Sequence, residues 1–462
     1  MRQPESELLQ HTRTASRPSD LRITDLRFAH VSASSMHCIL LKIETNQGLV
    51  GMGEMRDGSS ASYAGLLKSR LIGENPCDVD RLFRKIKQFG GPSRQGGGVS
   101  GVEIALWDLA GKAYGVPVYQ MLGGKFRRRV ELYCDQGRTP PEQCETGRKK
   151  GLALRQRMER FGIRMCKAVL GVEDVQRRNP DKPVLIGPSR LLQELTSPRP
   201  AEQSQDLAAV EDKRFAREMD DPRYIPHPFT MLRVTDLGLD LYEEYLSQLR
   251  EAVGWQTPLA IDHLGNLGLE DMTRLLRRME KYNLLWAEDP LPWYMTQAYR
   301  ALRQSTTTPL ATGEDAYLLE SFEPLCRQQA VSLIHPDVCS CGGILELKRL
   351  GNMAQSHGVA MACHMCETPV AALATAHAGL ATENFVACEF NAPDDDYWQD
   401  LVTGLREPLI QDGAIAPSDK PGLGMDGFND EVLLEHRWPG APAPWESTQR
   451  WDHEVSYDRI WS

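Results

Sequence analysis

Three acidic residues recur at equal intervals in the second half of this 462-residue chain. Asp262, Glu288 and Glu314 each come at the end of a short apolar run, and a helical pattern follows each run. This alternation is typical of successive βα units in a barrel, whose strands all end at one face. We therefore expect the three carboxylates to converge on a hard divalent cation, Mg²⁺ or Mn²⁺ in its place.

The alternative is that these acids cap helices or form salt bridges at the surface. A single acid at a helix start is common, because it complements the helix dipole. Three acids in register after apolar runs are harder to explain in that way. The pattern therefore favours a metal site formed by Asp262, Glu288 and Glu314.

Two further apolar runs continue the series. The first, Val331 to Asp337, ends in an acid, and the second, Val359 to His364, ends in a histidine. On adjacent strand ends, the carboxylate would fix the tautomer of the imidazole and raise its basicity. Alone, His364 would be interpreted as a core histidine, but beside a metal site it is a candidate base. Another acid, Glu389, follows the next apolar run.

The order of these residues resembles the signature of the mandelate racemase group of the enolase superfamily. Two N-terminal segments, Gly101–Lys112 and Tyr119–Gly124, are similar to the capping domain of that group. The resemblance covers most of the chain from Leu21 to Gly427, with one insertion as the exception. It implies an α/β fold, a modified TIM (β/α) barrel with an N-terminal α+β capping domain.

The resemblance also implies a reaction. His364, oriented by Asp337, would remove the proton alpha to a substrate carboxylate, and the metal would stabilise the enediolate. Glu389 belongs to the same catalytic set. Family members carry two lysines, Lys-x-Lys, on the second barrel strand. The first, which contacts the substrate carboxylate in the family, is kept as Lys167, although a surface lysine is the alternative; the second is replaced by Val169.

An aliphatic side chain such as Val169 cannot move a proton, so a racemisation that needs two bases is disfavoured. Loss of a β-hydroxyl is then the expected sequel, which makes the chain a Mg²⁺-dependent sugar-acid dehydratase, a carbon–oxygen lyase. In galactonate dehydratase-like members a histidine lies two residues after the metal-binding aspartate. Here Leu264 holds that position, and His263 is displaced by one. The general acid is therefore His263 or His364.

Two other functions remain open. One is epimerisation, racemisation or cycloisomerisation by an enzyme of the same superfamily. The other is a metal-binding barrel that has lost catalysis and serves as a regulator or scaffold. The missing second lysine and the displaced histidine favour the latter, whereas the Asp337–His364 pair argues against it.

The predicted domains are a disordered arm (1–20), the capping domain (21–128), the barrel (129–407) and a C-terminal return with a tail (408–462). Within the barrel, Gly171 to Arg233 exceeds what a βα unit needs and is rich in charge and proline. We expect this insertion to be peripheral, as a lid, an oligomer contact or a disordered segment. Gln95 to Gly98 is expected to be a flexible loop. Leu21 to Met55 is expected to form a β-hairpin region with its turn at Asn46–Gly48, and Asp236 to Val253 a helix with an apolar face.

The net charge and composition of the chain restrict the kinds of molecule that it can bind. The net charge of −10 argues against nucleic acid, and no apolar run is long enough to span a membrane. We expect a cytoplasmic homo-oligomer that binds a small acid sugar. The 11 cysteines suit a reducing compartment. Cys339, Cys341, Cys363 and Cys366 could suggest a zinc site, but their spacing favours free thiols.

Overall fold

The computed structural model describes residues 16–34, 36–135, 141–188, 192, 231–391 and 395–454. The barrel strands are β4 (Val130–Cys134), β5 (Met165–Val169), β8 (Leu259–Asp262), β9 (Ala287–Glu288), β10 (Leu310–Thr312), β11 (Leu333–Ile334), β12 (Ala360–Cys363) and β13 (Phe385–Phe390). Their order in the sheet is β13-β12-β11-β10-β9-β8-β5-β4, and an additional β13–β4 pairing closes the ring. The predicted (β/α) barrel with an N-terminal α+β capping domain is therefore confirmed.

The chain divides into two compact units. The first consists of Met1–Leu132, Gly313–Glu323 and His335–Ser462, and the second of Tyr133–Thr312 and Pro324–Ile334. The domain boundaries predicted from the sequence stay predictions. Most of the predicted disordered arm, residues 1–15, lies outside the described residues, and Pro18–Asp20 form a 3-10 helix.

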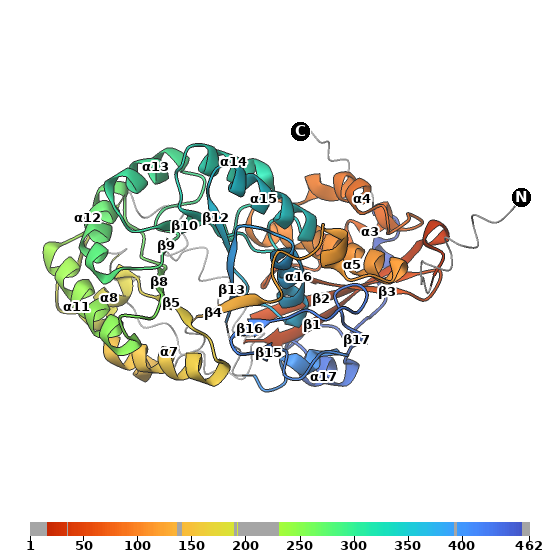
Figure 1. Ribbon diagram of the computed structural model, residues 1–462. Helices are drawn as coiled ribbons and strands as arrows, with labels where there is room; N and C mark the ends of the chain where they lie inside the picture. Colours follow the sequence, from red (N-terminus) through yellow and green to blue (C-terminus); the bar gives the residue numbers. More distant parts are fainter. Residues whose placement is uncertain are drawn as a thin grey trace, which may run out of the picture. The chain divides into compact units, whose positions relative to one another are not determined.

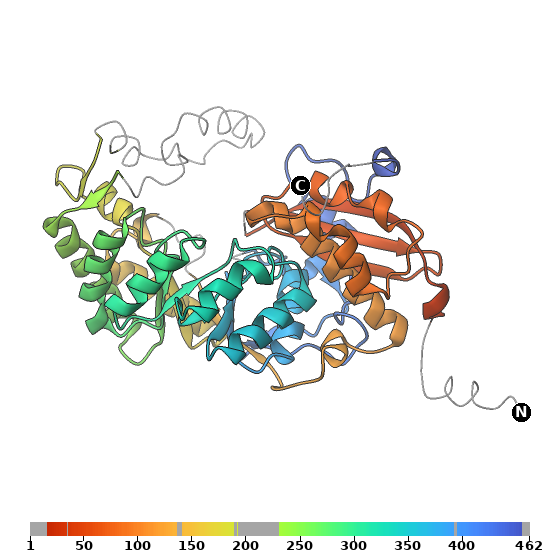
Figure 2. The ribbon, with the colours of Figure 1, turned by 90° about the horizontal axis from the view of Figure 1, so that it is seen from above.

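An antiparallel sheet opens the first unit. It consists of β1 (Ile23–Ala33), β2 (Met36–Thr45) and β3 (Val50–Met55), in the order β1-β2-β3. The predicted hairpin is present, with Glu44 opposite Val50 across the turn. The long helix α5 (Gly96–Tyr114) packs against β3, as Figures 1 and 2 show. Apolar side chains of the strands and of α5 form the core between them.

The prediction of a flexible loop at Gln95 to Gly98 is wrong, because α5 already begins at Gly96. The glycines serve close packing. A Cβ on Gly97 would lie 2.6 Å from Ser59 Oγ, and one on Gly98 would lie 2.3 Å from the Tyr63 carbonyl. Any side chain at these positions would push α5 away from the segment that follows β3.

Two helices of the first unit lie beside the last two barrel strands. Helices α15 (Ile344–Ser356) and α16 (Pro369–Leu380) pack against each other, and α16 also contacts β13 and β3. The closing segment contributes β16 (Ala414–Ile415), which pairs antiparallel with β4. Further elements of this unit are α2 (Ser62–Gly65), α3 (Lys68–Leu71), α4 (Val79–Ile86), α6 (Val118–Met121), β14 (Val402–Thr403), β15 (Ile410–Gln411), β17 (Gly427–Phe428) and α17 (Asp430–Glu435).

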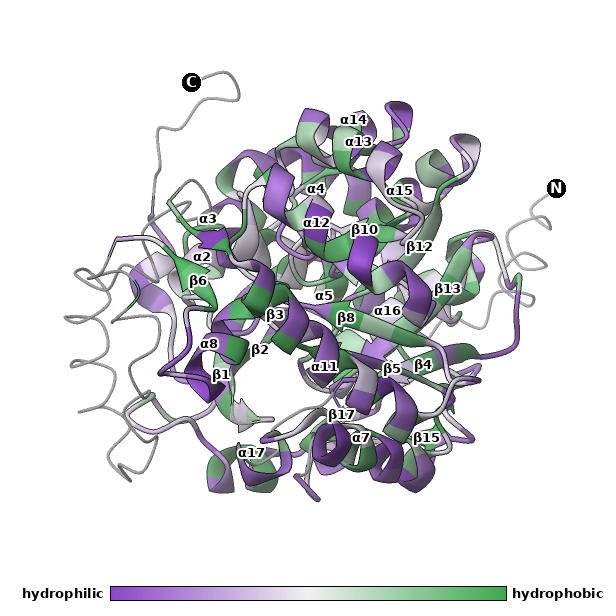
Figure 3. Ribbon diagram, turned by 90° about the vertical axis from the view of Figure 1, so that its left-hand side faces the viewer, coloured by the Kyte–Doolittle hydropathy of each residue, from purple (hydrophilic) through white to green (hydrophobic). Residues whose placement is uncertain are grey.

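In the second unit, helices lie outside the strands. They are α7 (Gly147–Phe161), α11 (Asp236–Val253), α12 (Leu269–Met279) and α13 (Thr296–Ser305), around β5, β8, β9 and β10 (Figure 1). Another helix, α14 (Leu319–Arg327), runs across the boundary of the two units. The predicted bounds of α11 are confirmed: Thr235 caps its start, accepting a hydrogen bond from the Gly238 N–H at 2.8 Å. Figure 3 shows α7 and α11 alternating between hydrophilic and hydrophobic residues, as half-buried helices do.

The first part of the predicted insertion is not peripheral. Val172–Arg178 form helix α8, which packs on α11 with Val172 and Val175 buried. Strand β6 (Leu185–Ile186) then pairs with β7 (Arg233–Val234). The apolar residues at i and i+3 explain this packing, which the charge-rich composition of the segment as a whole concealed. Residues 189–191 and 193–230 of the insertion lie outside the described part. No helix among the described residues is long and apolar enough to cross a membrane.

A buried histidine in the first unit makes stability depend on pH. This residue is His377, whose Nδ1 accepts a hydrogen bond from the Tyr119 N–H at 3.1 Å and whose Nε2 donates to the Leu423 carbonyl at 3.2 Å. The ring is therefore held in its neutral form. Burial lowers the pKa of His377 to about 4. Because the unfolded chain binds this proton more readily, the stabilisation is present above about pH 6.5 and is lost as the pH falls toward 4.

We expect His377→Gln to flatten the pH dependence of unfolding between pH 6.5 and 4. The wild type should lose up to about 1.4 kcal/mol per pH unit more than the variant in this window. Urea unfolding at several pH values measures the difference. Thr382→Val is the control, because it removes a buried hydroxyl that donates to the Ala378 carbonyl at 2.8 Å and does not titrate; it should lower stability without changing the slope. Parallel slopes for the wild type and His377→Gln would contradict the assignment.

Candidate active site

In the second unit, two of the predicted metal ligands end neighbouring strands. Asp262 is the last residue of β8 and Glu288 the last of β9, and the two strands run parallel. Both carboxylates are buried, with 3% and 0% of the residue exposed. A strand directs alternate side chains to the same face, which brings these two acids together inside the barrel wall.

Lys167 joins these two acids from the adjacent strand β5. Its Nζ lies 2.9 Å from Asp262 Oδ2 and 2.7 Å from Glu288 Oε1. The other oxygen of Glu288 accepts a hydrogen bond from Trp286 Nε1 at 2.8 Å. Val169 is directly opposite Asp262 in the register of β5 and β8, so the position of the family's second lysine also faces this group.

The donor chemistry of this group fits a divalent cation. Two buried carboxylates converge on one ammonium, so one negative charge remains unbalanced among the three side chains. Oxygen ligands of this kind suit Mg²⁺ or Mn²⁺. The third predicted ligand, Glu314, follows β10 and belongs to the first unit.

In the first unit, the predicted Asp–His pair is formed. His364 follows β12, and a parallel bridge joins it to Asp337. His364 Nδ1 lies 2.7 Å from Asp337 Oδ2, while Asp337 Oδ1 accepts from the Cys339 N–H at 2.6 Å. In the neutral imidazole, with Nδ1–H donating to Asp337, the second ring nitrogen, Nε2, is the proton acceptor.

Acidic groups surround Nε2 of His364. Glu314 Oε2 lies 3.3 Å and Glu389 Oε2 4.0 Å from it. Burial and the nearby Arg56 lower the pKa of His364, but Glu314, Glu389 and Asp337 together raise it, to about 10. Neutralising the carboxylates would bring this pKa back toward neutrality, where a general base is most effective.

Other groups contact this dyad that the sequence patterns did not predict. Arg56, one residue after β3, reaches Asp337 at 2.7 Å and Glu367 at 3.2 Å. Asp57 forms ion pairs with two arginines: its Oδ1 lies 3.1 Å from Arg56 Nε, and its Oδ2 lies 3.2 Å from Arg94 Nη2. A charged residue directly after a predicted strand was the available signal, but it does not reveal a partner far along the chain.

The displaced histidine lies beside the predicted metal ligands of the second unit. His263 Nε2 is 3.8 Å from Asp262 Oδ2, and 63% of the His263 side chain is exposed. Its backbone has a positive φ of 50°. Leu264, which holds the family's histidine position, is fully buried. The two residues therefore differ in environment, with the histidine at the surface and the leucine in the core.

The cysteines near the dyad are not in disulfide bonds, and the choice of free thiols over a zinc site stays a prediction. Cys339, Cys341, Cys363 and Cys366 are all buried, and burial raises the pKa of each well above its ordinary value. Zinc binds the thiolate form, which these surroundings disfavour. The four residues are packed as small apolar side chains around the strand ends.

Comparisons with known proteins agree with this geometry. The family described as mandelate racemase / muconate lactonizing enzyme, N-terminal domain, matches residues 12–123, and the enolase C-terminal domain-like family matches residues 214–431. A D-xylonate dehydratase of Haloferax volcanii is 29% identical over 92% of this chain and 91% of its own. A D-galactonate dehydratase of Pectobacterium atrosepticum is 25% identical, over 87% of this chain and 92% of its own.

A solved structure gives the same result for the fold. The mandelate racemase/muconate lactonizing enzyme-like protein of Rubrobacter xylanophilus superimposes with a TM-score of 0.73 and 28% identity, covering 92% of this chain and 99% of the other. Members of the superfamily bind a divalent metal, and the buried acids described above are candidates to hold one. Because the two family matches together cover most of its length, the chain belongs to the enolase superfamily, in the group of mandelate racemase and muconate lactonizing enzyme.

Proposed function

We propose that this protein is a Mg²⁺-dependent dehydratase of an acid sugar, a carbon–oxygen lyase. The observation that carries the proposal is the hydrogen bond between His364 Nδ1 and Asp337 Oδ2, which leaves Nε2 to accept a proton. The names of the relatives support it, because they are dehydratases of xylonate and galactonate. Those sugar acids share a carboxylate, an acidic α-proton and a β-hydroxyl.

The first step is removal of the α-proton by His364. The C–H bond breaks, the proton moves to Nε2, and the electron pair enters the carboxylate to form an enediolate. Asp337 holds the ring in position and stabilises the imidazolium that forms. Lys167 contributes positive charge beside the substrate carboxylate. When bound by Asp262, Glu288 and Glu314, the divalent cation supplies Lewis-acid stabilisation of the developing negative charge.

The second step is loss of the β-hydroxyl. The electron pair of the enediolate forms the new double bond, the β C–O bond breaks, and the hydroxyl leaves as water after taking one proton. Tautomerisation of the resulting enol gives a 2-keto-3-deoxy acid. We assign the proton of the leaving group to His364, which carries it after the first step. His263, with its largely exposed side chain, is the other candidate.

Val169 supports a one-base reaction. It occupies the position of the family's second base, and its side chain can neither donate nor accept a proton. Epimerisation or racemisation would need such a group on the opposite face of the substrate. The proposal therefore favours dehydration over both, and the Asp337–His364 pair favours activity over a catalytically inactive scaffold.

A screen of acid sugars with Mg²⁺ for 2-keto-3-deoxy products tests the function. We expect turnover of one or a few substrates, dependence on the metal, and loss of activity in chelator that added Mg²⁺ restores. Epimerised product without keto acid would indicate another reaction of the superfamily. Inactivity against a broad library, with Mg²⁺ bound normally, would support the inactive scaffold.

A further inference from the structure

Arg56 is buried in the first unit with carboxylates on several sides. Only 2% of its side chain is exposed. Its Nε lies 3.1 Å from Asp57 Oδ1, and its Nη1 lies 2.7 Å from Asp337 Oδ2 and 3.2 Å from Glu367 Oε1. Glu314 Oε1 is 3.6 Å from Nη2. A buried guanidinium is tolerated only where anions compensate it, and this one has four.

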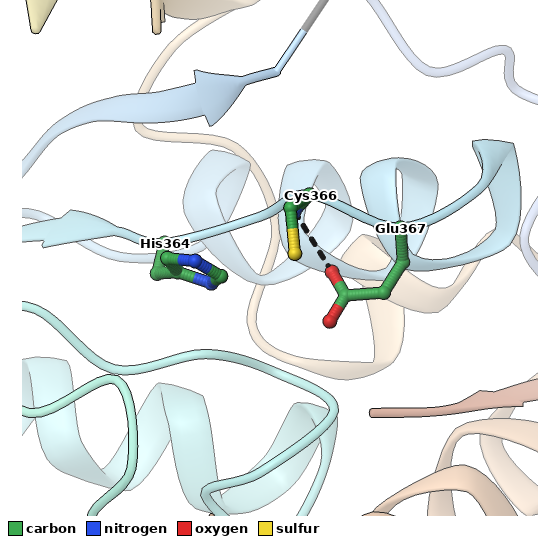
Figure 4. A group of neighbouring side chains, drawn as sticks. All are labelled: His364, Cys366 and Glu367. Carbon is green, nitrogen blue, oxygen red and sulfur yellow. Dashed lines mark hydrogen bonds between the residues drawn. The ribbon is translucent and has the colours of Figure 1, made fainter. Parts of the chain in front are cut away.

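The guanidinium explains a group of side chains that could otherwise be interpreted as a metal site. His364, Cys366 and Glu367 place ligand atoms within 4.8 Å of one another (Figure 4). Arg56 Nη1 lies 2.6 Å from His364 Nδ1, 3.8 Å from Cys366 Sγ and 3.2 Å from Glu367 Oε1. The position of a metal ion in this group is thus already taken by a cation of the chain itself.

Arg56 and His364 meet at the same oxygen. Arg56 Nη1 and His364 Nδ1 each lie 2.7 Å from Asp337 Oδ2. Because the guanidinium is always protonated, it can only donate to this oxygen. The two hydrogens of Nη1 can both point to carboxylates, Asp337 Oδ2 and Glu367 Oε1, so its contact with His364 Nδ1 at 2.6 Å is not a hydrogen bond when Nδ1 itself donates to Oδ2. A carboxylate fixed by Arg56 presents Oδ2 to the ring in one direction, which favours this tautomer and leaves Nε2 to accept.

Arg56 is held in place at its backbone and, through Glu367, at its guanidinium. A Cβ on Gly97 would lie 2.8 Å from the Arg56 backbone nitrogen, so α5 presses directly against this residue. On the other side, Glu367 Oε2 accepts from the Cys366 N–H at 2.9 Å, the hydrogen bond drawn in Figure 4. Trp398 Nε1 donates to the Glu367 carbonyl, also at 2.9 Å. These contacts leave Arg56 little freedom to move.

We propose that Arg56, supplied by the N-terminal segment after β3, is a positioning residue for the Asp337–His364 dyad. It acts through Asp337, and its side chain is more deeply buried than that of His364, with 2% against 9% exposed. The inference rests on the proposed role of His364 as the base. It assigns to the N-terminal segment a part in the proton transfer itself, through the orientation of the dyad.

The test compares Arg56→Gln, Arg56→Lys and the double variant Arg56→Gln/Glu367→Gln in the full-length protein with Mg²⁺. Arg56→Gln leaves buried carboxylates uncompensated and is expected to destabilise the fold. The double variant removes one of those charges and should recover much of the melting temperature. Arg56→Lys keeps the charge but not the planar fork that meets two carboxylates at once.

We expect the double variant to fold yet to remain impaired in proton transfer. Its kcat for α-proton exchange into deuterated water should fall about 10- to 100-fold, which is the cost of one charged hydrogen bond, with KM within about twofold of the wild type. Arg56→Lys should be intermediate. Lys68→Met removes another buried cation of this unit, bonded to Asp25 at 2.6 Å, and should affect stability alone.

A second readout does not depend on activity. Imidazole ¹⁵N NMR of the Mg²⁺-bound protein, assigned with His364→Asn, reports which ring nitrogen of His364 carries the proton. We expect Nδ1–H in the wild type and a mixture of tautomers in the double variant. Wild-type exchange and a wild-type tautomer in the double variant would overturn the proposal. A wild type that turns over no acid sugar would refute the proposed function, whereas the tautomer would still decide the role of Arg56.

Discussion

His364→Asn is expected to lose exchange of the substrate α-proton into deuterated water while still binding Mg²⁺. Asparagine keeps an N–H that can donate to Asp337, but it cannot accept a proton at neutral pH. Loss of a positioned base typically lowers the rate by a factor of about 10² to 10⁴. The dehydration rate should fall further, because His364 is also assigned as the acid. Proton NMR of the substrate measures exchange, and assay of the keto acid measures dehydration.

Two further variants serve as comparisons for His364→Asn. Asp337→Asn should be less severe, because it misorients the imidazole without removing it, although it also takes a charge from Arg56. His357→Gln, at the end of α15, should exchange at the wild-type rate. The one-base mechanism would be wrong if His364→Asn exchanged as fast as the wild type. It would also be wrong if the wild type racemised the α-carbon as fast as it dehydrates.

Glu288→Gln is expected to weaken Mg²⁺ binding by at least about tenfold and to abolish turnover. The amide has one acceptor oxygen, whereas the carboxylate accepts from both Lys167 at 2.7 Å and Trp286 at 2.8 Å. One of those buried donors therefore loses its partner, and the melting temperature should fall modestly. Lys167 keeps Asp262 at 2.9 Å, so the fold should survive.

Calorimetric titration with Mg²⁺ and circular dichroism measure the two effects separately. Asp271→Asn is the matched control, because Asp271 is a buried carboxylate of the same unit that binds Arg233 and Arg274 on the outer helix layer. It should lower stability and leave Mg²⁺ affinity unchanged. An unchanged affinity in Glu288→Gln would remove this residue from the metal site.

Much of the fold follows from local patterns in the sequence. Apolar runs that end in an acid and precede a helical period predicted barrel strands, and the structure has Asp262 and Glu288 as the last residues of β8 and β9. Helix α11 was predicted to its bounds, because both its apolar face and its cap lie within one stretch of sequence. The pairing of Asp337 with His364 followed from the fact that successive βα units place their strands side by side.

Tertiary packing determined the structure of two segments that local sequence patterns did not predict. The three glycines after Gln95 indicate flexibility when seen alone, but in the structure they let α5 approach the segment after β3. The start of the insertion has the composition of a solvated segment, yet the side chains of α8 that face α11 are apolar. In both places the outcome depended on how closely two elements pack against each other. The sequence of one segment alone does not give this distance.

The order of the acids and the Asp–His pair followed from the sequence, because a strand's period fixes which side chains share a face. The loss of the second lysine at Val169 followed from the resemblance of the sequence to the family. Only the tertiary structure placed Arg56 on the dyad: 281 positions separate it from Asp337, and the two meet at 2.7 Å. It also decided that Lys167 contacts both Asp262 and Glu288. Such contacts depend on how elements distant in the sequence pack together. Because a buried charge is costly unless it is paired, groups of opposite charge lie next to one another there.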